Sequence, residues 1–245
     1  MEKPSPVQIL STRALGNGVH DFINQQNWRV DIVSMIETHG IVTVDQIKAI
    51  LADIQLGSPK ILLTFSSDKG VKWLKWGLDK FGFSLPAGLR AVCVGEKTGK
   101  VAAEWLGIEC VWTEKDASAL LNTVRDVVKE GTSFLFLCSN KHLDILPSGI
   151  KAAGFPFKEY IIYETQLTPH KLAKTYDAIL FFSPSAVESY FLVNNWNQEM
   201  VAVSIGHTTS AALQHAGVQK LIIANHPSES SMMEALQFYL KDGIK

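Results

Sequence analysis

Short apolar runs recur along this chain at intervals that leave room for a helix between most of them. They stand at 7–10, 28–33, 60–65, 91–94, 108–112, 133–138, 159–164, 178–182, 201–205 and 220–224. Amphipathic stretches of helical length lie between several of them, at 72–82, 117–131 and 228–243. Continuous apolar runs, in contrast to strictly alternating ones, are typical of parallel strands with helices on both faces. The pattern therefore predicts an α/β fold built on parallel sheets.

Part of this pattern is repeated within the chain. The segments 91–109 and 202–219 share an apolar run that ends in glycine, a threonine three residues later, and then an alanine-rich stretch. The residues concerned are Gly95 with Thr98 and Gly206 with Thr209. A second pair of similar segments stands at 64–74 and 180–191. Two similar α/β halves are the simplest explanation of these repeats.

The order of the runs indicates that one half is discontinuous. The apolar runs at 7–10 and 28–33 both precede the first copy of the repeat, whereas only the run at 178–182 directly precedes the second copy. The N-terminal residues can therefore complete the C-terminal half of the chain. We expect one domain of residues 1–36 plus 168–245 and a second domain of residues 37–167.

Composition and charge limit the partners of the chain. Its 245 residues include 47% hydrophobic and 19% charged residues, as in ordinary globular proteins, with a formal net charge of −1. This charge balance provides no field that would attract nucleic acid or an anionic membrane. The three cysteines form no C-x-x-C pair and fit reduced thiols, and the N-terminus lacks the apolar core of a secretory signal. We therefore expect a cytoplasmic protein that binds neither nucleic acid nor membrane.

Small hydroxyl residues follow four of the apolar runs, where parallel strands lead into helices. They are Ser66, Ser67, Thr98, Ser183, Ser185, Thr208 and Thr209. Helix N-termini present unpaired N–H groups that can hold a carboxylate or phosphate, and ligands of open parallel sheets gather at this edge. Singly, each hydroxyl is better explained as a helix cap. Together, the paired turns predict an anion-binding site, in which Gly95 and Gly206 would allow a tight turn or close backbone approach.

Other familiar sites do not occur in the sequence. Neither repeated segment matches a G-x-G-x-x-G or P-loop pattern, and no G-x-S-x-G motif supplies a nucleophile. The histidines have no metal-ligand spacing, so we expect no metal site. Arg13 follows the first run and could direct its guanidinium at a carboxylate, although such an arginine is more often merely solvated. Tyr163 either donates a hydrogen bond in a cleft between the domains or, as the plainer alternative, packs at a sheet edge.

The set of motifs that contains these residues resembles the uroporphyrinogen-III synthase family. The motifs are Thr12-Arg13, FSSDKGV at 65–71, VGEKT at 94–98, IYET at 162–165, FSPSAV at 182–187 and IGHTT at 205–209. They cover nearly the whole chain in the order of the family. Two segments depart from the family pattern: Ser34 stands where a proline is usual, and LCSNKH at 137–142 lacks the usual glycine. We assign no site residue from the latter segment.

The resemblance implies two flavodoxin-like α/β domains with parallel sheets, one of them discontinuous, joined by a two-stranded linker. It implies an enzyme that converts linear hydroxymethylbilane into uroporphyrinogen III with loss of water and inversion of the last pyrrole ring, without metal or organic cofactor. Tyr163 would assist departure of the hydroxyl group. The substrate-binding residues would be Thr12, Arg13, Ser66, Ser67, Gly95, Thr98, Ser183, Ser185, Gly206, Thr208 and Thr209. We expect a monomer that transiently contacts the preceding enzyme of the pathway.

Two other classes of protein fit the residues when the resemblance is set aside. One is a two-domain sensor or binding protein that closes on an acidic metabolite without transforming it. The other is an ordinary flavodoxin-like protein that binds a cofactor. Both share the parallel sheets and the polar strand ends, so the sequence pattern does not separate them from an enzyme.

Overall fold

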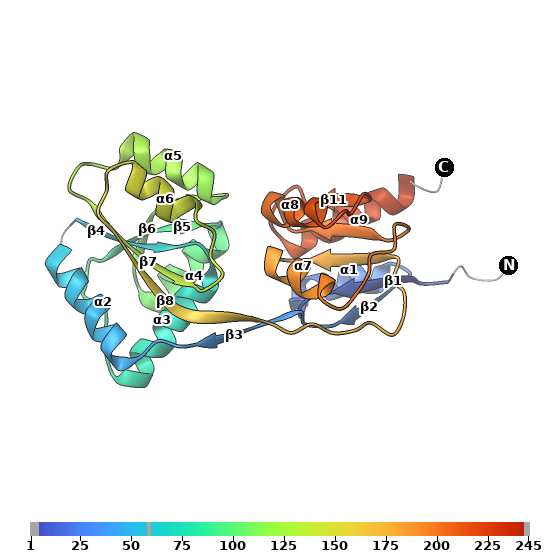
Figure 1. The fold of residues 1–245 in the computed structure, drawn as a ribbon, viewed down its shortest axis with the longest axis horizontal. Helices are drawn as coiled ribbons and strands as arrows, with labels where there is room; N and C mark the ends of the chain where they lie inside the picture. The colour runs from blue at the N-terminus through green and yellow to red at the C-terminus, as the bar shows by residue number, and fades with distance from the viewer. Residues whose placement is uncertain (1–4, 58–59, 243–245) are drawn as a thin grey trace. The chain divides into compact units, whose positions relative to one another are not determined.

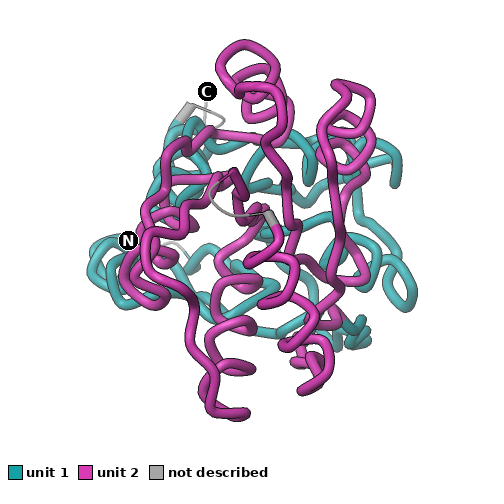
Figure 2. Tube along the Cα trace, turned by 90° about the vertical axis from the view of Figure 1, so that its left-hand side faces the viewer, with its two compact units in different colours: residues 1–37, 166–245 teal, residues 38–165 magenta. Residues whose placement is uncertain are grey.

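The computed structural model describes residues 5–57 and 60–242, and the chain forms two compact units (Figure 2). Unit 1 comprises residues 1–37 and 166–245, and unit 2 comprises residues 38–165. The chain thus crosses between the units at 37–38 and at 165–166, where the sequence analysis placed the crossings at 36–37 and 167–168.

Unit 1 is a parallel five-stranded sheet with the strand order β11-β10-β9-β1-β2 (Figure 1). Its strands are β1 (Val7–Ser11), β2 (Trp28–Ile32), β9 (Ala178–Phe181), β10 (Val201–Ser204) and β11 (Leu221–Ile223). Its helices are the 3₁₀ helix η1 (Asn17–Val19), α1 (His20–Gln25), α7 (Pro184–Phe191), α8 (His207–His215) and α9 (Glu229–Asp242). Each strand coincides with an expected apolar run.

Both faces of the unit 1 sheet are buried, which explains why its runs are continuous. Along β9, Ala178 and Leu180 belong to one apolar cluster, together with Met232 of α9. The alternate residues Ile179 and Phe181 belong to the cluster on the other face. Successive strand residues point to opposite faces, so a strand covered on both sides needs apolar residues at every position.

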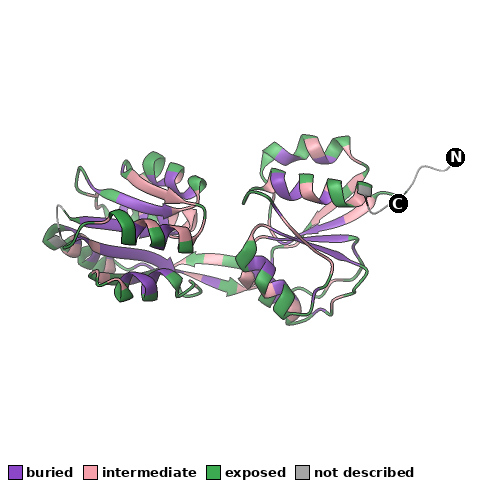
Figure 3. Cartoon of the chain, turned by 90° about the horizontal axis from the view of Figure 1, so that it is seen from above, coloured by how far each residue is buried: buried purple, intermediate pink, exposed green. Residues whose placement is uncertain are grey.

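Unit 2 contains a six-stranded sheet with the order β3-β8-β7-β4-β5-β6. Its strands are β3 (Ile36–Gly40), β4 (Ile61–Phe65), β5 (Arg90–Val94), β6 (Glu109–Glu114), β7 (Ser133–Ser139) and β8 (Phe157–Leu167). Its helices are α2 (Val44–Gly57), α3 (Asp68–Phe81), α4 (Glu96–Leu106), α5 (Ala117–Val127) and α6 (Ile145–Ala152). The pairs β7–β8, β7–β4, β4–β5 and β5–β6 are parallel, and the central strands are buried (Figure 3).

The apolar runs of the sequence did not predict strand β3. Its residues alternate between partly buried and exposed, because it lies at the edge of the sheet, where β8 is its neighbour. Both chain crossings fall within these two neighbouring strands. Within the described residues, no helix has the length and hydropathy needed to cross a bilayer.

The two repeated glycines differ in conformation, contrary to the equivalence that the sequence suggested. Gly95 precedes α4 with φ 84°, a left-handed value that favours glycine. Gly206 precedes α8 with φ 179°, an extended backbone that any residue adopts, and a Cβ atom there would meet nothing within 4 Å. Only the first of the two turns therefore requires glycine.

We predict that Gly95→Ala destabilises the protein by about 1–2 kcal/mol, because an L-residue is strained at this φ. A Cβ atom at this position would contact only Thr98 Oγ1, at 3.8 Å, so the cost comes from the backbone and not from a clash. The matched control Gly206→Ala should leave stability unchanged. Urea unfolding measures both variants, and equal free energies of unfolding would contradict the prediction.

Candidate functional site

In unit 2, polar residues gather at the carboxyl ends of the central strands. Strand β4 ends at Phe65 and leads through Ser66 and Ser67 into α3. Both serines are half-buried, and Ser67 caps α3 by accepting a hydrogen bond from the backbone N of Lys69 at 3.3 Å. This is the edge at which open parallel sheets bind ligands.

Tyr163 of β8 reaches the same edge. Its side chain is only 5% exposed, and burial raises the pKa of its phenol to about 12, although hydrogen bonds with the side chains of Ser139 and Ser67 offset part of the rise. The phenol is therefore neutral at ordinary pH. The structure thus brings Tyr163 together with one of the predicted binding serines, Ser67.

Ser139, the other partner of Tyr163, comes from the segment to which the sequence analysis assigned no site residue. Strands β7 and β8 pair in register from Phe134 to Cys138, and a register shift then places Ser139 opposite Tyr163. The only sequence signal for this residue is a hydroxyl at the end of a buried strand. The irregularity that puts it next to the phenol has no signature in the sequence.

The Ser67 and Ser139 hydroxyls make similar hydrogen bonds to the backbone. Ser139 Oγ accepts a hydrogen bond from the backbone N of Lys141 at 3.1 Å, as Ser67 Oγ does from Lys69. A hydroxyl that accepts from an N–H group still has its own proton to donate. Both serines can therefore donate to the phenolic oxygen, which leaves the phenolic proton for another acceptor.

A cluster of charged residues lies at the first turns of α3 and α4. Asp68 Oδ2 is 2.9 Å from Lys72 Nζ and 3.2 Å from Lys97 Nζ. Burial would raise the pKa of Asp68, but the hydrogen bond to Lys72 and the charge of Lys97 outweigh it and lower this pKa below its usual value. Two cations thus share one carboxylate beside Glu96, the first residue of α4, and the sequence analysis did not predict this cluster.

Gly95 and Thr98 form the turn that leads from β5 into α4. The Gly95 carbonyl accepts a hydrogen bond from the backbone N of Thr98 at 3.0 Å. Thr98 lies inside the first helical turn and is 5% exposed. Its side chain is therefore far less accessible than that of the neighbouring Lys97.

In unit 1, two of the predicted turns present polar groups at the sheet edge. Ser183 caps α7 by accepting a hydrogen bond from the backbone N of Ala186 at 3.2 Å, and Ser185 is half-buried. At the start of α8, Thr208 is exposed whereas Thr209 is 1% exposed. Thr208 is thus the more accessible hydroxyl of this pair.

Thr12 and Arg13 have partners within unit 1. The Thr12 hydroxyl donates to the carbonyl of Leu180 at 2.8 Å and so joins β1 to β9. Arg13 Nη2 lies 2.8 Å from Glu229 Oε1, and its guanidinium stacks over the Phe182 ring at 4.2 Å. The arginine therefore pairs with a carboxylate of the protein itself, at the first residue of α9.

A cavity of unit 1 lies away from these turns. Its volume is about 530 Å³, and its lining includes Tyr176, two residues before β9, and Met200, the residue before β10. The cavity therefore lies at the amino ends of these strands. Parallel sheets bind ligands at the opposite edge.

Unit 2 also brings together three potential metal ligands. Cys138, His142 and Glu159 each offer a donor atom, and these atoms lie within 4.8 Å of one another. The sequence analysis predicted no metal site, because the histidines have no regular ligand spacing.

Comparison with known proteins identifies the fold and the family. Residues 20–234 match the family model described as uroporphyrinogen-III synthase HemD. A uroporphyrinogen-III synthase of Chlorobaculum parvum is 27% identical over 165 residues, which cover 62% of this chain and 67% of that protein.

Solved structures agree. The uroporphyrinogen-III synthetase of Helicobacter pylori has a TM-score of 0.66 at 17% identity, covering 96% of this chain and 99% of that chain. A mutant uroporphyrinogen III synthase of Thermus thermophilus has a TM-score of 0.68 at the same identity and coverage. On the family match, the chain belongs to the uroporphyrinogen-III synthase family.

Proposed function

We propose that this enzyme converts linear hydroxymethylbilane into uroporphyrinogen III, closing the macrocycle with inversion of the last pyrrole ring. Family membership supports the reaction. The observation that carries the mechanism is the neutral phenol of Tyr163 between the side chains of Ser67 and Ser139. The family match does not favour a binding protein that leaves its ligand unchanged.

Tyr163 would assist the departure of the substrate hydroxyl. Breaking the carbon–oxygen bond releases water once the leaving oxygen has received a proton. The new carbon–carbon bond would form at the α-carbon of the last pyrrole ring that already carries a methylene bridge. The original bond from that carbon to its bridge would then break and re-form at the free α-carbon of the same ring, which inverts the ring. Loss of the proton from this carbon restores the phenol. Ser67 and Ser139 would hold the phenolic oxygen and aim its proton at the leaving group. With a pKa of about 12 the phenol is a weak acid, so hydrogen bonding in the transition state is its main contribution.

The remaining predicted residues would bind the substrate carboxylates. The turns at Ser66, Ser67, Gly95, Thr98, Ser183, Ser185, Gly206, Thr208 and Thr209 offer backbone N–H groups at helix N-termini. Lys72 and Lys97 would add positive charge. For Thr12 and Arg13 we propose positioning roles, because both are held by partners within the protein. Binding that brings the two ends of the tetrapyrrole together would supply much of the rate enhancement.

We further propose that the enzyme is a monomeric hydro-lyase whose reaction needs no cofactor, and that it takes its substrate from the preceding enzyme. Its place would be the cytoplasm. The three cysteines are free thiols, which is consistent with a reducing compartment.

The direct test supplies the purified protein with enzymatically generated hydroxymethylbilane and resolves the type I and type III products. Spontaneous closure leaves the ring uninverted and gives type I. We expect type III to dominate, and a product mixture identical to the protein-free reaction would contradict the function.

Replacing Tyr163 by Phe should lower the rate of type III formation on the order of tenfold, less than is usual for a general acid, because the phenol is weakly acidic. The fraction of type I product should rise, since spontaneous closure then competes. Tyr239→Phe is the matched control, because this tyrosine is 37% exposed on α9 of unit 1. Full activity of the Tyr163 variant would remove the assigned role.

Lys97→Ala should raise KM roughly two- to fivefold, which corresponds to the ~0.5–1 kcal/mol of an exposed charge pair. The effect should shrink at high salt, because screening weakens surface charges. Lys75→Ala on α3 is the control, since Lys75 pairs with Asp79 on the same helix at 2.5 Å. An unchanged KM at low salt would show that Lys97 does not contact the substrate.

Alkaline pH should destabilise the protein in part through Tyr163. Its pKa of about 12 lies above the ~10 of an unfolded tyrosine. The folded state therefore holds the proton more tightly, and this contribution is complete below pH ~10 and is lost as the pH rises towards 12. Burial also raises the pKa of Tyr176 and of Tyr190 to about 12, so both contribute to stability over the same pH range. Urea unfolding at pH 9 and 11.5 should show a smaller loss of stability in Tyr163→Phe, and an equal loss would contradict the pKa assignment.

A further inference from the structure

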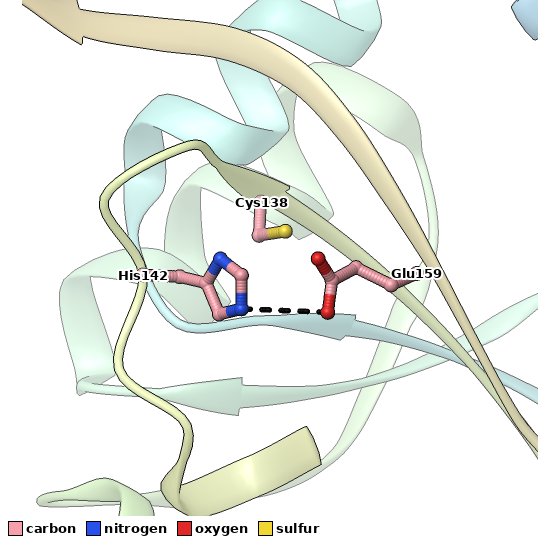
Figure 4. Close-up of side chains that lie close together, drawn as sticks. All are labelled: Cys138, His142 and Glu159. Atoms are coloured by element: carbon pink, nitrogen blue, oxygen red, sulfur yellow. Dashed lines mark ion pairs between the residues drawn. The ribbon is translucent and has the colours of Figure 1, made fainter.

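The loop that follows β7 folds His142 back towards the neighbouring strand β8. Figure 4 shows His142 and Glu159 facing each other with Cys138 beside them. The His142 Nε2 and Glu159 Oε2 atoms are 3.3 Å apart. Cys138 is 1% exposed, whereas the side chains of His142 and Glu159 are 18% and 27% exposed. The cluster is thus closed on the cysteine side and open to solvent on the other.

The orientation of the imidazole leaves one ring nitrogen for a ligand. His142 Nδ1 lies 2.8 Å from the carbonyl oxygen of Ser139, which can only accept a hydrogen bond, so Nδ1 carries the proton. The ring edge also packs against Phe136, with centroids 5.4 Å apart. In the neutral imidazole the lone pair of Nε2 then points at the Glu159 carboxylate. Two lone pairs that face each other need a proton or a cation between them.

We propose that Cys138, His142 and Glu159 bind a zinc ion through Sγ, Nε2 and a carboxylate oxygen, with water as the fourth ligand. A histidine that donates its other N–H to a backbone carbonyl is the usual orientation of a zinc ligand. Donor atoms of one zinc tetrahedron lie roughly 3.3–3.7 Å apart, given zinc–ligand distances of ~2.0–2.3 Å. His142 Nε2 and Glu159 Oε2, at 3.3 Å, already lie at such a distance, and all three donor atoms lie within 4.8 Å of one another.

The charge and chemistry of the three groups select the metal. A thiolate and a carboxylate together neutralise a divalent cation, which suits a site that is largely withdrawn from water. A set of sulfur, nitrogen and oxygen donors favours zinc over magnesium or calcium, which prefer oxygen ligands alone. Zinc binds the thiolate form of a cysteine, so the metal has to displace the thiol proton of Cys138. Binding should therefore release a proton and tighten as the pH rises.

The site lies on the opposite face of the sheet from the proposed catalytic tyrosine. Cys138 packs with Phe136 and Leu146 in one apolar cluster, whereas Tyr163 belongs to the cluster on the other face. Bound zinc would therefore not touch the substrate. It would tie the end of β7, the loop after it and β8 together, and so hold the backbone of Ser139.

Calorimetry and cobalt spectroscopy on the full chain, stripped of metal with a chelator, test the proposal. We expect zinc to bind at one equivalent, with release of a proton that shows as a dependence of the heat on the buffer. Cobalt(II) should produce a thiolate charge-transfer band. Cys138→Ser, His142→Ala and Glu159→Gln should each weaken zinc binding at least about tenfold.

Matched controls identify the thiol that binds. Cys110→Ser should bind zinc like the unchanged protein, because Cys110 Sγ instead lies 3.0 Å from Cys93 Sγ. His215→Gln on α8 of unit 1 serves the same purpose for histidine. Circular dichroism shows whether each variant folds. If Cys138→Ser and His142→Ala do not fold, Glu159→Gln still tests the site, because it preserves the size of the side chain. Absence of stoichiometric zinc binding, or loss of binding in Cys110→Ser with retention in Cys138→Ser, would overturn the proposal.

Discussion

Burial of both faces of each parallel sheet is the constraint on which the other features depend. In central strands such as β4 and β9, residues at every position pack under helices, so the polar groups of these strands gather where the strands end and the helices begin. Ser67 accordingly lies in the turn after β4, Ser139 is the last residue of β7, and Tyr163 is the residue of β8 that pairs with Ser139. A phenol in such a place is surrounded by apolar core on one side and by hydroxyl groups on the other, which keeps it neutral and oriented.

The two sides of strand β7 illustrate how one segment serves two kinds of chemistry. Consecutive residues of a strand point to opposite faces. Cys138 thus lies with His142 and Glu159 under α5 and α6, while Ser139 lies with Tyr163 on the α3 side. The shift in register between these two residues separates the two environments further, because it pairs Ser139 with Tyr163 and not with Ile162.

Charge is arranged locally in a protein whose net charge is −1. Asp68 holds Lys72 and Lys97 at the adjoining N-termini of α3 and α4, so two ammonium groups gather there although the chain as a whole is not basic. In unit 1, by contrast, the guanidinium of Arg13 forms an ion pair with a single carboxylate, that of Glu229 at the start of α9. An anionic ligand would therefore meet quite different donors on the two units.

The sequence by itself determined the α/β class, the positions of the central strands and the family, because two-sided burial leaves continuous apolar runs and because short motifs keep their order. It also indicated the hydroxyl turns and Tyr163. Only the tertiary structure decided which of these groups have partners: Thr12 donates to Leu180, Arg13 pairs with Glu229, and Ser139 faces Tyr163. The tertiary structure alone also brings Cys138, His142 and Glu159 together, because these residues meet across the neighbouring strands β7 and β8. Pairing between strands and irregularities in register bring distant residues together, and local residue patterns do not encode them.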